Sequence, residues 1–596
     1  MMHGAEKLAA LRAVLAGDEL DGFVLPRGDE HLGEYVAPYA ERLAWLTGFT
    51  GSAGMVVVLS DRAAVFSDGR YVLQLAAQTD PACFEREHIT ETPPEDWLAA
   101  ALRGGEGEKR IGYDPWLLSQ DVLARFNKHG FRMVPVARNP VDAIWHDRPA
   151  PPLLPAVPHP MEFAGRESSE KRQEIAAILR AAGQDAAVLT DPASVNWLFN
   201  IRGRDVGFTP FALGFAVLES DGSAILFMAP EKIDDALLAW LGDGVSVRPP
   251  DALASVLAGY AGRVVRIDPS ASAVWFAQTL REAGATVSPG ADPCALPKAR
   301  KNAAEQAGFR RAHALDAMAL CGFLQFVAEH GVGLTETELS QHLDRFRARS
   351  AEYRGESFPA ISGTGPNGAI IHYRADPATA RRLGPDEVYL IDSGGQYASG
   401  TTDVTRTLWS GPGPAPAELR ERVTRVLKGH IALSRARFPQ GVHGGRLDAL
   451  ARTALWQAGL DYDHGTGHGV GSCLSVHEGP CGISPAARPV PIEAGMVLSN
   501  EPGFYAAGAY GIRLENLVLV VPQPVGQSKP FLGFEPLTLV PFDRALFDVA
   551  LLDETERDWI DSYHRLVLER IGPLVDDANR PWLEAACAPL ELNDPV

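Results

Sequence analysis

The sequence predicts an α/β (α+β) protein in which two similar mixed α/β domains at the N-terminus are followed by a larger C-terminal domain. The chain has 596 residues, 46% of them hydrophobic, which is enough for several buried cores and is atypical of disordered chains. Two proline-rich breaks divide the chain. In its first half, short apolar segments alternate with segments that favour helix, a pattern typical of α/β folds.

Proline marks both predicted domain boundaries. Residues 139–160 contain too many prolines to continue a helix or a central strand, so they predict an extended connector. A second break lies at residues 293–297, directly before a segment rich in helix-forming residues. We therefore expect domains at residues 1–150, 151–297 and 298–596, the last with a C-terminal extension.

The first two predicted domains follow one plan. In residues 21–77, and again in 185–228, a short apolar strand is followed by a polar turn, an aromatic-rich segment that ends in glycine, and further strands. This repetition indicates duplication of a mixed α/β unit.

The third predicted domain combines long helices with strands that carry acidic residues. Helical spacing of apolar residues predicts helices at 301–330, ending before Gly331, at 417–438, with Pro416 as a first helical residue, and at 558–571. Strands are predicted at 388–392 and 400–409, joined by a tight loop with a turn at 393–396. Two further strands are predicted at 496–505 and 510–520, separated by a glycine turn.

Composition and charge exclude several classes of function. Lys plus Arg total 55 and Asp plus Glu total 75, a net charge of −20, and no long basic run offers the phosphate-binding surface that nucleic-acid binding needs. Charges interrupt the N-terminal residues, and no run of 18 apolar residues follows, so we expect neither a signal peptide nor a membrane span. Six cysteines without CxxC spacing fit reduced thiols. These features predict a cytoplasmic protein.

Five side chains in the third domain predict a metal centre. They lie in stretches that otherwise read as buried strand or glycine turn, and removing a carboxylate from water costs several kcal/mol unless something neutralises it. Any one of the acids alone could be a turn or surface residue, but the set together favours a cation. The set comprises Asp392, Asp403, His468, Glu501 and Glu515.

The donor set also predicts how many metal ions bind and of what kind. Oxygen donors with one imidazole favour manganese, cobalt or iron over calcium. Manganese is the first choice, and cobalt or zinc are the alternatives. Four carboxylates carry more negative charge than one divalent ion normally collects, whereas two ions about 3.5–4 Å apart can share bridging carboxylates. We therefore expect two divalent metal ions, with Mn2+ as first choice.

The segments around these five residues resemble a known family. The strings GPNGAIIHY, IDSGGQY, TTDVTRT, HGTGHGVG, HEGP, SNEPGFY and GIRLEN closely resemble aminopeptidase P, the Xaa-Pro aminopeptidase branch of the pita-bread metallopeptidases. The resemblance extends to DGRY at 68–71, WLFNIRG at 197–203 and FEPLTLVPFD near the C-terminus, so it covers nearly the whole chain in the long, three-domain form. It implies two creatinase-like N-terminal domains and a pita-bread catalytic domain.

The resemblance assigns a role to each of the five residues. Carried over position by position, it implies that Asp392 binds one metal ion and that Asp403 and Glu515 bridge both ions. It implies that His468 and Glu501 complete the second ion's shell. Glu501 is also the expected proton shuttle from the attacking hydroxide to the leaving nitrogen.

Three loop histidines and one arginine complete the expected site. His372, His464 and His477 lie in glycine- or proline-interrupted loops, where a lone histidine is ordinarily a solvated surface group. The resemblance implies instead that they contact the substrate and the developing oxyanion. A zinc pair of His464 with His468 on one helix is rejected because the intervening glycines disfavour a helix. Arg70, by sequence alone a surface arginine, would bind substrate at the mouth of a site in its own or a partner subunit.

The implied reaction is hydrolysis of the first peptide bond of a peptide whose second residue is proline. The bond before proline has no N–H, so it needs a dedicated pocket. Three alternatives remain open: a prolidase-like dipeptidase, a general aminopeptidase, and a catalytically silent binding homologue. The expected partners are peptide substrates and a second copy of the chain, in a homodimer formed through the third domain.

Overall fold

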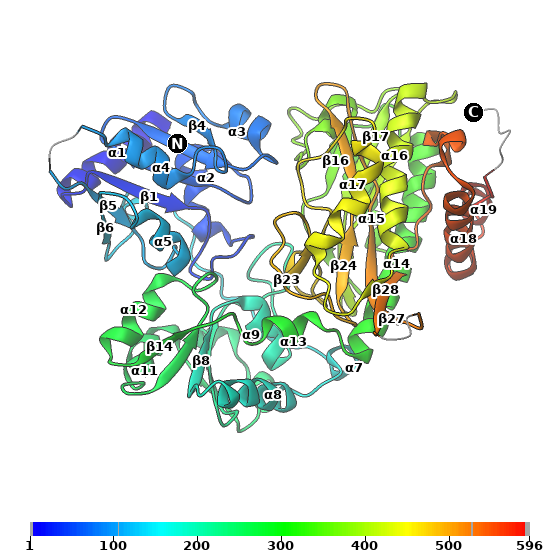
Figure 1. Ribbon diagram of the computed structural model, residues 1–596. Helices are drawn as coiled ribbons and strands as arrows, with labels where there is room; N and C mark the ends of the chain where they lie inside the picture. The colour runs from blue at the N-terminus through cyan, green and yellow to red at the C-terminus, as the bar shows by residue number, and fades with distance from the viewer. Residues whose placement is uncertain (1–3, 105–106, 526–528, 591–596) are drawn as a thin grey trace. The chain divides into compact units, whose positions relative to one another are not determined.

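The computed structural model describes residues 4–104, 107–525 and 529–590. Residues 1–3 and 591–596, at the outer ends of the first and third predicted domains, lie outside the described part. The chain divides into two compact units, Met1–Ala295 and Leu296–Val596, whose elements are labelled in Figure 1.

The first unit contains two six-stranded sheets of the same topology. In each sheet the first strand pairs antiparallel with the second and parallel with the fifth, and the outer strands on both sides are parallel to their neighbours. This confirms the prediction of two similar mixed α/β domains. The first sheet has the order β4-β3-β2-β1-β5-β6, formed by Glu85–His88, Ala63–Ser67, Met55–Leu59, Gly22–Pro26, Arg110–Tyr113 and Arg132–Pro135. The second has the order β12-β11-β10-β8-β13-β14, formed by Val245–Arg248, Ala224–Phe227, Phe215–Glu219, Ala186–Leu189, Val264–Ile267 and Thr286–Pro289.

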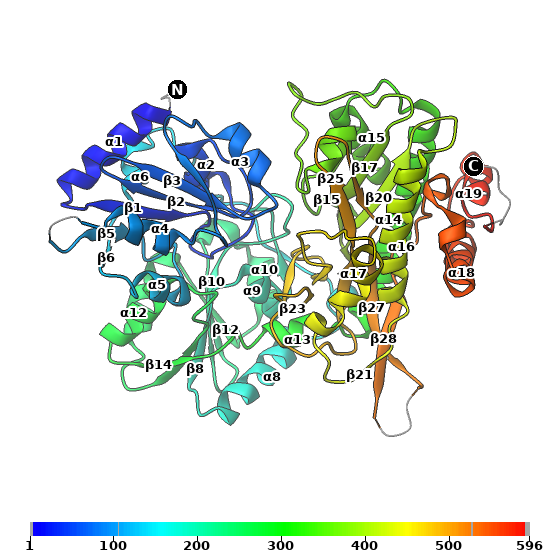
Figure 2. The same ribbon diagram turned by 45° about the horizontal axis from the view of Figure 1, so that its top comes forward.

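Helices cover both faces of the first sheet, as Figure 2 shows. Successive side chains of a strand point to opposite faces, so Phe23 and Leu25 pack in one cluster and Val24 packs in another. The first cluster includes α1 (Gly4–Gly17), α2 (Arg42–Thr47) and α6 (Pro140–Ile144), and the second includes α4 (Pro94–Ala101) and α5 (Gln120–Phe126). The sheet is therefore buried on both sides.

The predicted connector at residues 139–160 is only partly extended. Its first residues form the short helix α6, in which the Asn139 side chain accepts a hydrogen bond from the Val141 backbone N–H and Pro140 occupies the first turn. The expectation of no helix here is therefore wrong, because proline is compatible with a first helical position, where its missing N–H has no helical partner. No helix follows within residues 146–160, which contain only the short strand β7, Val157–Pro158.

The second unit packs long helices against its sheets. The helix predicted from residue 301 is α14, Ala303–His330, which Asn302 and Glu305 cap reciprocally and which ends before Gly331. Helix α16 begins at Ala417, one residue later than predicted, with Pro416 as its N-cap. It packs beside α17 (Asp448–Trp456) in both views (Figure 1 and Figure 2). Helices α15 (Glu336–Arg347) and α18 (Glu554–Ile571) join the same core, with Leu339, Leu343, Ile560 and Val567 fully buried or nearly so.

Within the described residues, the second unit contains three sheets of three or more strands. One sheet has the order β16-β17-β20, formed by Ile361–Thr364, Val388–Ser393 and Val404–Trp409. A second has the order β15-β18-β19, formed by Tyr353–Glu356, Gly395–Tyr397 and Gly400–Thr401. The largest has the order β21-β28-β27-β24-β22-β23, formed by Phe438–Pro439, Phe531–Pro536, Asn516–Gln523, Val497–Asn500, Gly467–Gly469 and Glu478–Ile483.

Two sequence-based expectations about these strands are wrong. The predicted turn at 393–396 contains the start of β18, so the link from Asp392 to Asp403 is a small hairpin rather than a tight loop. Residues 496–520 form four strands rather than two, because β25 (Gly503–Ala506) and β26 (Tyr510–Arg513) pair only with each other. Pro502 lies between β24 and β25, where it cannot donate to a sheet ladder.

No helix within the described ranges is both long and apolar enough to cross a membrane.

Candidate metal centre

Strand pairing brings Asp392 and Asp403 together. Strands β17 and β20 are antiparallel, with Asp392 opposite Thr405 and Ser393 opposite Val404. Asp403 directly precedes β20, so it lies at the same end of the pair as Asp392. Both carboxylates are buried, at 8% and 4% exposure.

A second strand pair brings Glu501 and Glu515 together. Strands β24 and β27 are antiparallel, with Asn500 opposite Asn516, so Glu501, which follows β24, and Glu515, which precedes β27, lie at the same end. His468 is on β22, which pairs with β24. The Glu515 backbone N–H donates to the Thr405 carbonyl at 3.2 Å, which joins the two pairs of strands.

The five residues converge at this junction. Ligand atoms of Asp403, His468 and Glu515 all lie within 4.8 Å of one another. His468 Nε2 is 3.4 Å from Asp403 Oδ2 and 3.5 Å from Glu501 Oε1. Its Nδ1 is 2.9 Å from the Gly469 carbonyl, which directs Nε2 toward the carboxylates.

Burial and mutual repulsion perturb the proton affinities of these groups. Burial, reinforced by the charges of neighbouring carboxylates, raises the pKa of Asp392 to about 7 and raises the pKa values of Glu501 and Glu515. Burial alone would lower the pKa of His468, but its contact with Asp403 and the charge of Glu501 raise that pKa to about 9. The cluster therefore holds protons tightly when nothing else neutralises it.

The oxygen atoms of the cluster fit a cation. Three buried carboxylate oxygens of the cluster have no hydrogen-bond partner within the described residues: Asp392 Oδ1, Asp403 Oδ1 and Glu515 Oε1. Buried polar atoms are normally paired, and an unpaired carboxylate oxygen is costly. Three such oxygens around one imidazole match the donors that divalent transition metals take. The residues present thus fit the expected metal group.

A set of polar residues that sequence reasoning missed supports the centre. Arg513 donates to Asp392 Oδ2 at 2.6 Å and to the Tyr505 hydroxyl at 2.6 Å. Thr405 donates to Glu515 Oε2 at 2.6 Å. A signal for Arg513 was present in the sequence, because residues two apart in an extended segment share a face and Arg513 stands two before Glu515. Such residues orient metal ligands and tune their basicity.

The loop histidines lie in different surroundings. His464 Nε2 is 2.8 Å from the Tyr505 hydroxyl, so it is connected through Tyr505 and Arg513 to Asp392. The His477 ring stands edge-on to the His468 ring, with centroids 4.4 Å apart. His372 follows the 3-10 helix η4 (Gly365–Ala369) and is half-buried. The chain between His464 and His468 contains no helix, as the glycines predict.

Arg70 belongs to the first unit. Its guanidinium donates to both carboxylate oxygens of Asp68, at 2.8 and 2.7 Å, and lies over the Tyr71 ring. Its expected contact with substrate stays a prediction.

Buried ion pairs anchor two of the histidine loops. Arg452 and Asp448 of α17 form a buried ion pair at 2.6 Å. Arg452 also donates to the His464 carbonyl at 2.7 Å, and Asp448 accepts from the Thr466 hydroxyl at 2.7 Å. Glu478, which follows His477, contacts the ammonium groups of Lys298 and Lys301 at 3.0 and 2.5 Å. The buried charges are thus partnered, as burial requires.

Comparison with protein families agrees with this architecture. Residues 307–522 match metallopeptidase family M24, and residues 530–590 match the C-terminal region of peptidase M24. Residues 7–142 and 147–305 each match a creatinase/prolidase N-terminal domain. The predicted fold, two creatinase-like domains followed by a pita-bread domain, is confirmed.

Similar proteins span the full length of the chain. A probable Xaa-Pro aminopeptidase P of Coprinopsis cinerea is 37% identical over 98% of each chain. Aminopeptidase P1 of Arabidopsis thaliana is 35% identical over 99% of this chain and 100% of its own. The solved X-prolyl aminopeptidase of Caenorhabditis elegans, described as a cytosolic enzyme with a di-nuclear active site, matches with a TM-score of 0.93 and 35% identity, covering 99% of this chain and 100% of its own.

Proposed function

The chain belongs to the Xaa-Pro aminopeptidase P family of metallopeptidases, and we propose that it hydrolyses the first peptide bond of peptides whose second residue is proline. The observation that carries the proposal is the cluster of three buried carboxylates with two partly buried ligands, in a chain similar from end to end to aminopeptidases of this specificity. The buried carboxylates are Asp392, Asp403 and Glu515, whose unpaired oxygens lie beside His468 and Glu501.

The proposed cofactor is a pair of divalent metal ions. Asp392 would hold one ion, Asp403 and Glu515 would contact both, and His468 and Glu501 would complete the second. Two observations support this: the C. elegans enzyme is described as di-nuclear, and the oxygen-rich donor set with one imidazole favours manganese, with cobalt or zinc as alternatives. When bound, such ions lower the pKa of a water molecule and polarise a carbonyl group.

The side chains around the centre have distinct proposed roles. Glu501, which accepts a hydrogen bond from Ser499 at 3.0 Å, would carry a proton from the attacking water to the prolyl nitrogen. His464 and His477 would donate to the oxyanion, a contribution of about 3 kcal/mol for a well-placed donor. His372 would contact the substrate beside its proline, and Arg70 would contact the peptide downstream.

Substrate specificity and metal dependence can be tested together. The chain is stripped with a chelator and reloaded separately with manganese, cobalt and zinc, and bound metal is counted by mass spectrometry. Release of arginine is then followed from Arg-Pro-Pro, Arg-Ala-Ala and the dipeptide Arg-Pro. We expect two ions per chain and metal-dependent cleavage of Arg-Pro-Pro with little cleavage of Arg-Ala-Ala.

Each alternative function has its own outcome in this experiment. Cleavage of Arg-Pro alone would identify a prolidase-like dipeptidase, and equal cleavage of Arg-Ala-Ala would identify a general aminopeptidase. Two bound metal ions without turnover would identify a binding homologue.

We further propose a cytoplasmic homodimer that forms through the second unit. Support for the location is the description of the C. elegans enzyme as cytosolic. Light scattering should give twice the mass of one chain, and a monomeric mass at micromolar concentration would refute the dimer.

A further inference from the structure

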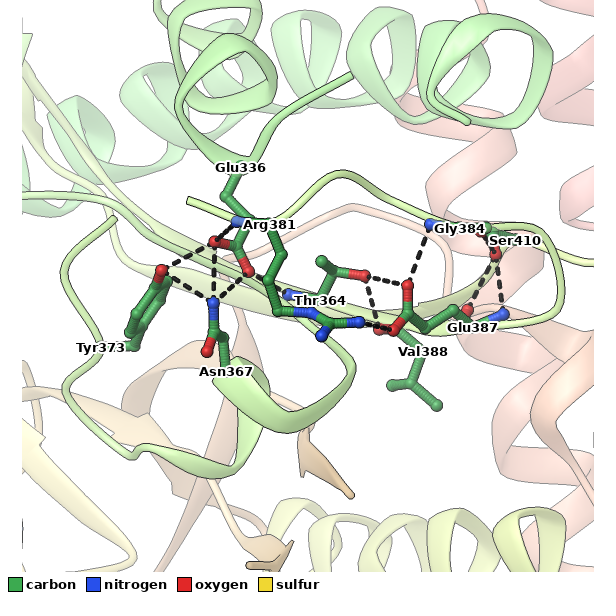
Figure 3. A network of polar contacts seen from close by, with 9 residues as sticks. All are labelled: Glu336, Thr364, Asn367, Tyr373, Arg381, Gly384, Glu387, Val388 and Ser410. Atoms are coloured by element: carbon green, nitrogen blue, oxygen red, sulfur yellow. Dashed lines mark hydrogen bonds and ion pairs between the residues drawn. The ribbon is translucent and has the colours of Figure 1, made fainter. Parts of the chain in front are cut away.

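A buried glutamate outside the metal centre organises the loop that carries His372. Glu336 is the first residue of α15 and has no exposed surface. Figure 3 shows its carboxylate among the side chains of Asn367 and Tyr373 and the backbone of Arg381. A carboxylate buried in this way is stable only where donors surround it.

Four groups donate to the Glu336 carboxylate. They are the Tyr373 hydroxyl at 2.7 Å, the Thr364 backbone N–H at 2.8 Å, the Arg381 backbone N–H at 2.9 Å and the Asn367 amide, 3.0 Å from both oxygens. Asn367 also lies 2.9 Å from the Tyr373 hydroxyl. Both carboxylate oxygens are thereby used.

The backbone of Glu336 adds two further contacts. Its N–H donates to the Arg381 carbonyl at 3.0 Å, and its carbonyl accepts from the Ser362 hydroxyl at 2.7 Å. One residue therefore holds both ends of the segment 362–381 as well as its middle.

The donors bracket His372 on both sides. Asn367 lies five residues before it and Tyr373 directly after it, while Tyr373 packs with Ile361 and Leu390. Thus the backbone at His372 is tied through its neighbours to α15, although Glu336 itself is 36 positions away in the sequence.

The same segment lies against the strands of the metal centre. Ile361, at the start of β16, is opposite Asp392. A Cβ atom on Gly511 would stand 1.7 Å from the Gly368 carbonyl oxygen, so η4 is in close backbone contact with β26, two residues before Arg513. A shift of this segment would therefore move His372 relative to Asp392 and its partners.

We propose that Glu336 is the positioning residue for His372 in the peptidase reaction, holding the loop so that the imidazole meets the substrate. This rests on the proposed function. Glutamine cannot replace Glu336, because its amide offers only one acceptor atom. The amide also adds two N–H donors that would face the donors of Tyr373, Asn367 and the backbone. Aspartate, one methylene shorter, cannot reach all four donors from the same backbone position.

The test is a double-mutant cycle measured as kcat/KM for Arg-Pro-Pro with the manganese-loaded chain. In the wild-type background Glu336→Gln should lower kcat/KM about 10- to 100-fold, because small misplacements of a substrate-contacting group have effects of this size. In the His372→Ala background the same change should lower it less than about threefold, since coupled residues are non-additive.

Glu387 provides a matched control. It is the second carboxylate of the network in Figure 3, and it accepts from the Thr364 hydroxyl at 3.0 Å, the Gly384 N–H at 2.9 Å and the Arg381 guanidinium at 2.6 Å. None of these donors belongs to the residues adjoining His372, so Glu387→Gln should be additive with His372→Ala. Equal coupling for both glutamates would overturn a specific role of Glu336.

A second variant and a second readout keep the inference testable if Glu336→Gln fails to fold. Tyr373→Phe removes one hydrogen-bond donor to Glu336 and leaves the Glu336 charge in place. It should show the same coupling to His372→Ala, with a smaller decrease in kcat/KM. Hydrogen exchange of residues 365–381 should accelerate in either variant, while β17 and β20 stay protected. If the wild-type enzyme is active but the effects of the Glu336 and His372 substitutions are additive, the positioning role of Glu336 is refuted and the proposed function stands. An inactive wild-type enzyme would refute the proposed function, and this inference with it.

Discussion

Removing the metal should make the stability of the enzyme fall as the pH rises. In the metal-free protein, burial raises the pKa of Asp392 from its ordinary 3.8 to about 7. A carboxyl group with a raised pKa binds its proton more tightly in the folded state than in the unfolded state, so unfolding becomes easier as the pH climbs between those two values. His468 acts in the same direction at higher pH. Its pKa rises from 6.5 to about 9, so its stabilising contribution is complete below pH 6.5 and is lost as the pH rises through 9.

The expected magnitude follows from these values. A single titrating group changes the free energy of unfolding by about 1.4 kcal/mol per pH unit between its two pKa values. From pH 5 to pH 7, Asp392 alone therefore removes on the order of 3 kcal/mol of stability. For units of about 150–250 residues, 1 kcal/mol corresponds to about 2–4 °C in melting temperature. The second unit, Leu296–Val596, is larger, so the decrease should be on the order of 5 °C.

Thermal unfolding at pH 5, 6, 7 and 8 measures the effect, with and without manganese. Asp392→Asn is the control, because it keeps the shape of the side chain and removes its ionisation. The metal-free wild type should lose stability relative to this variant as the pH rises. The manganese-loaded enzyme should instead gain stability relative to Asp392→Asn as the pH rises, because metal ions bind deprotonated ligands. A constant difference between metal-free wild type and Asp392→Asn from pH 5 to pH 7 would refute the reasoning.

Three further predictions concern individual residues. Asp403→Ala and Glu515→Ala should each weaken both metal ions together, so metal counting should show well under one ion per chain; retention of one tight ion would argue against bridging. Arg513→Leu leaves Asp392 without its 2.6 Å partner and should weaken metal binding about 10- to 100-fold, whereas Arg513→Lys should weaken it less. Competition with a metal-chelating dye measures the affinity. Unchanged metal affinity in both variants would contradict the role assigned to the guanidinium. His464→Ala should lower kcat for Arg-Pro-Pro about 100-fold with little change in KM, and an effect confined to KM in steady-state kinetics would exclude oxyanion stabilisation.

The predicted parts of the fold are those that local patterns determine. Helix α14 was predicted from apolar spacing and its ending glycine. The proximity of Asp392 and Asp403 was predicted from two strands close in sequence. The common plan of the first two domains was visible in their repeated segments, and the two sheets have the same strand order. The domain boundaries near residues 150 and 297 remain predictions.

The other features depend on contacts between distant segments. Arg513 reaches Asp392 across 121 positions of sequence, and Glu336 gathers donors from residues 364 to 381. A buried first-turn glutamate resembles any helix-capping residue in the sequence, so no local pattern distinguishes Glu336. The hairpin between Asp392 and Asp403 was missed because its glycines favour a turn as readily as a short strand.

The buried contact of Lys298 and Lys301 with Glu478 affects how the second unit can be produced separately. Both lysines stand at the very beginning of that unit, ahead of residue 307, where the match to family M24 starts. A recombinant fragment trimmed to that match would lack both ammonium groups and leave the Glu478 carboxylate buried beside His477 without a counter-charge, a defect that typically costs about 3–5 kcal/mol. A soluble, active fragment should therefore begin before residue 298.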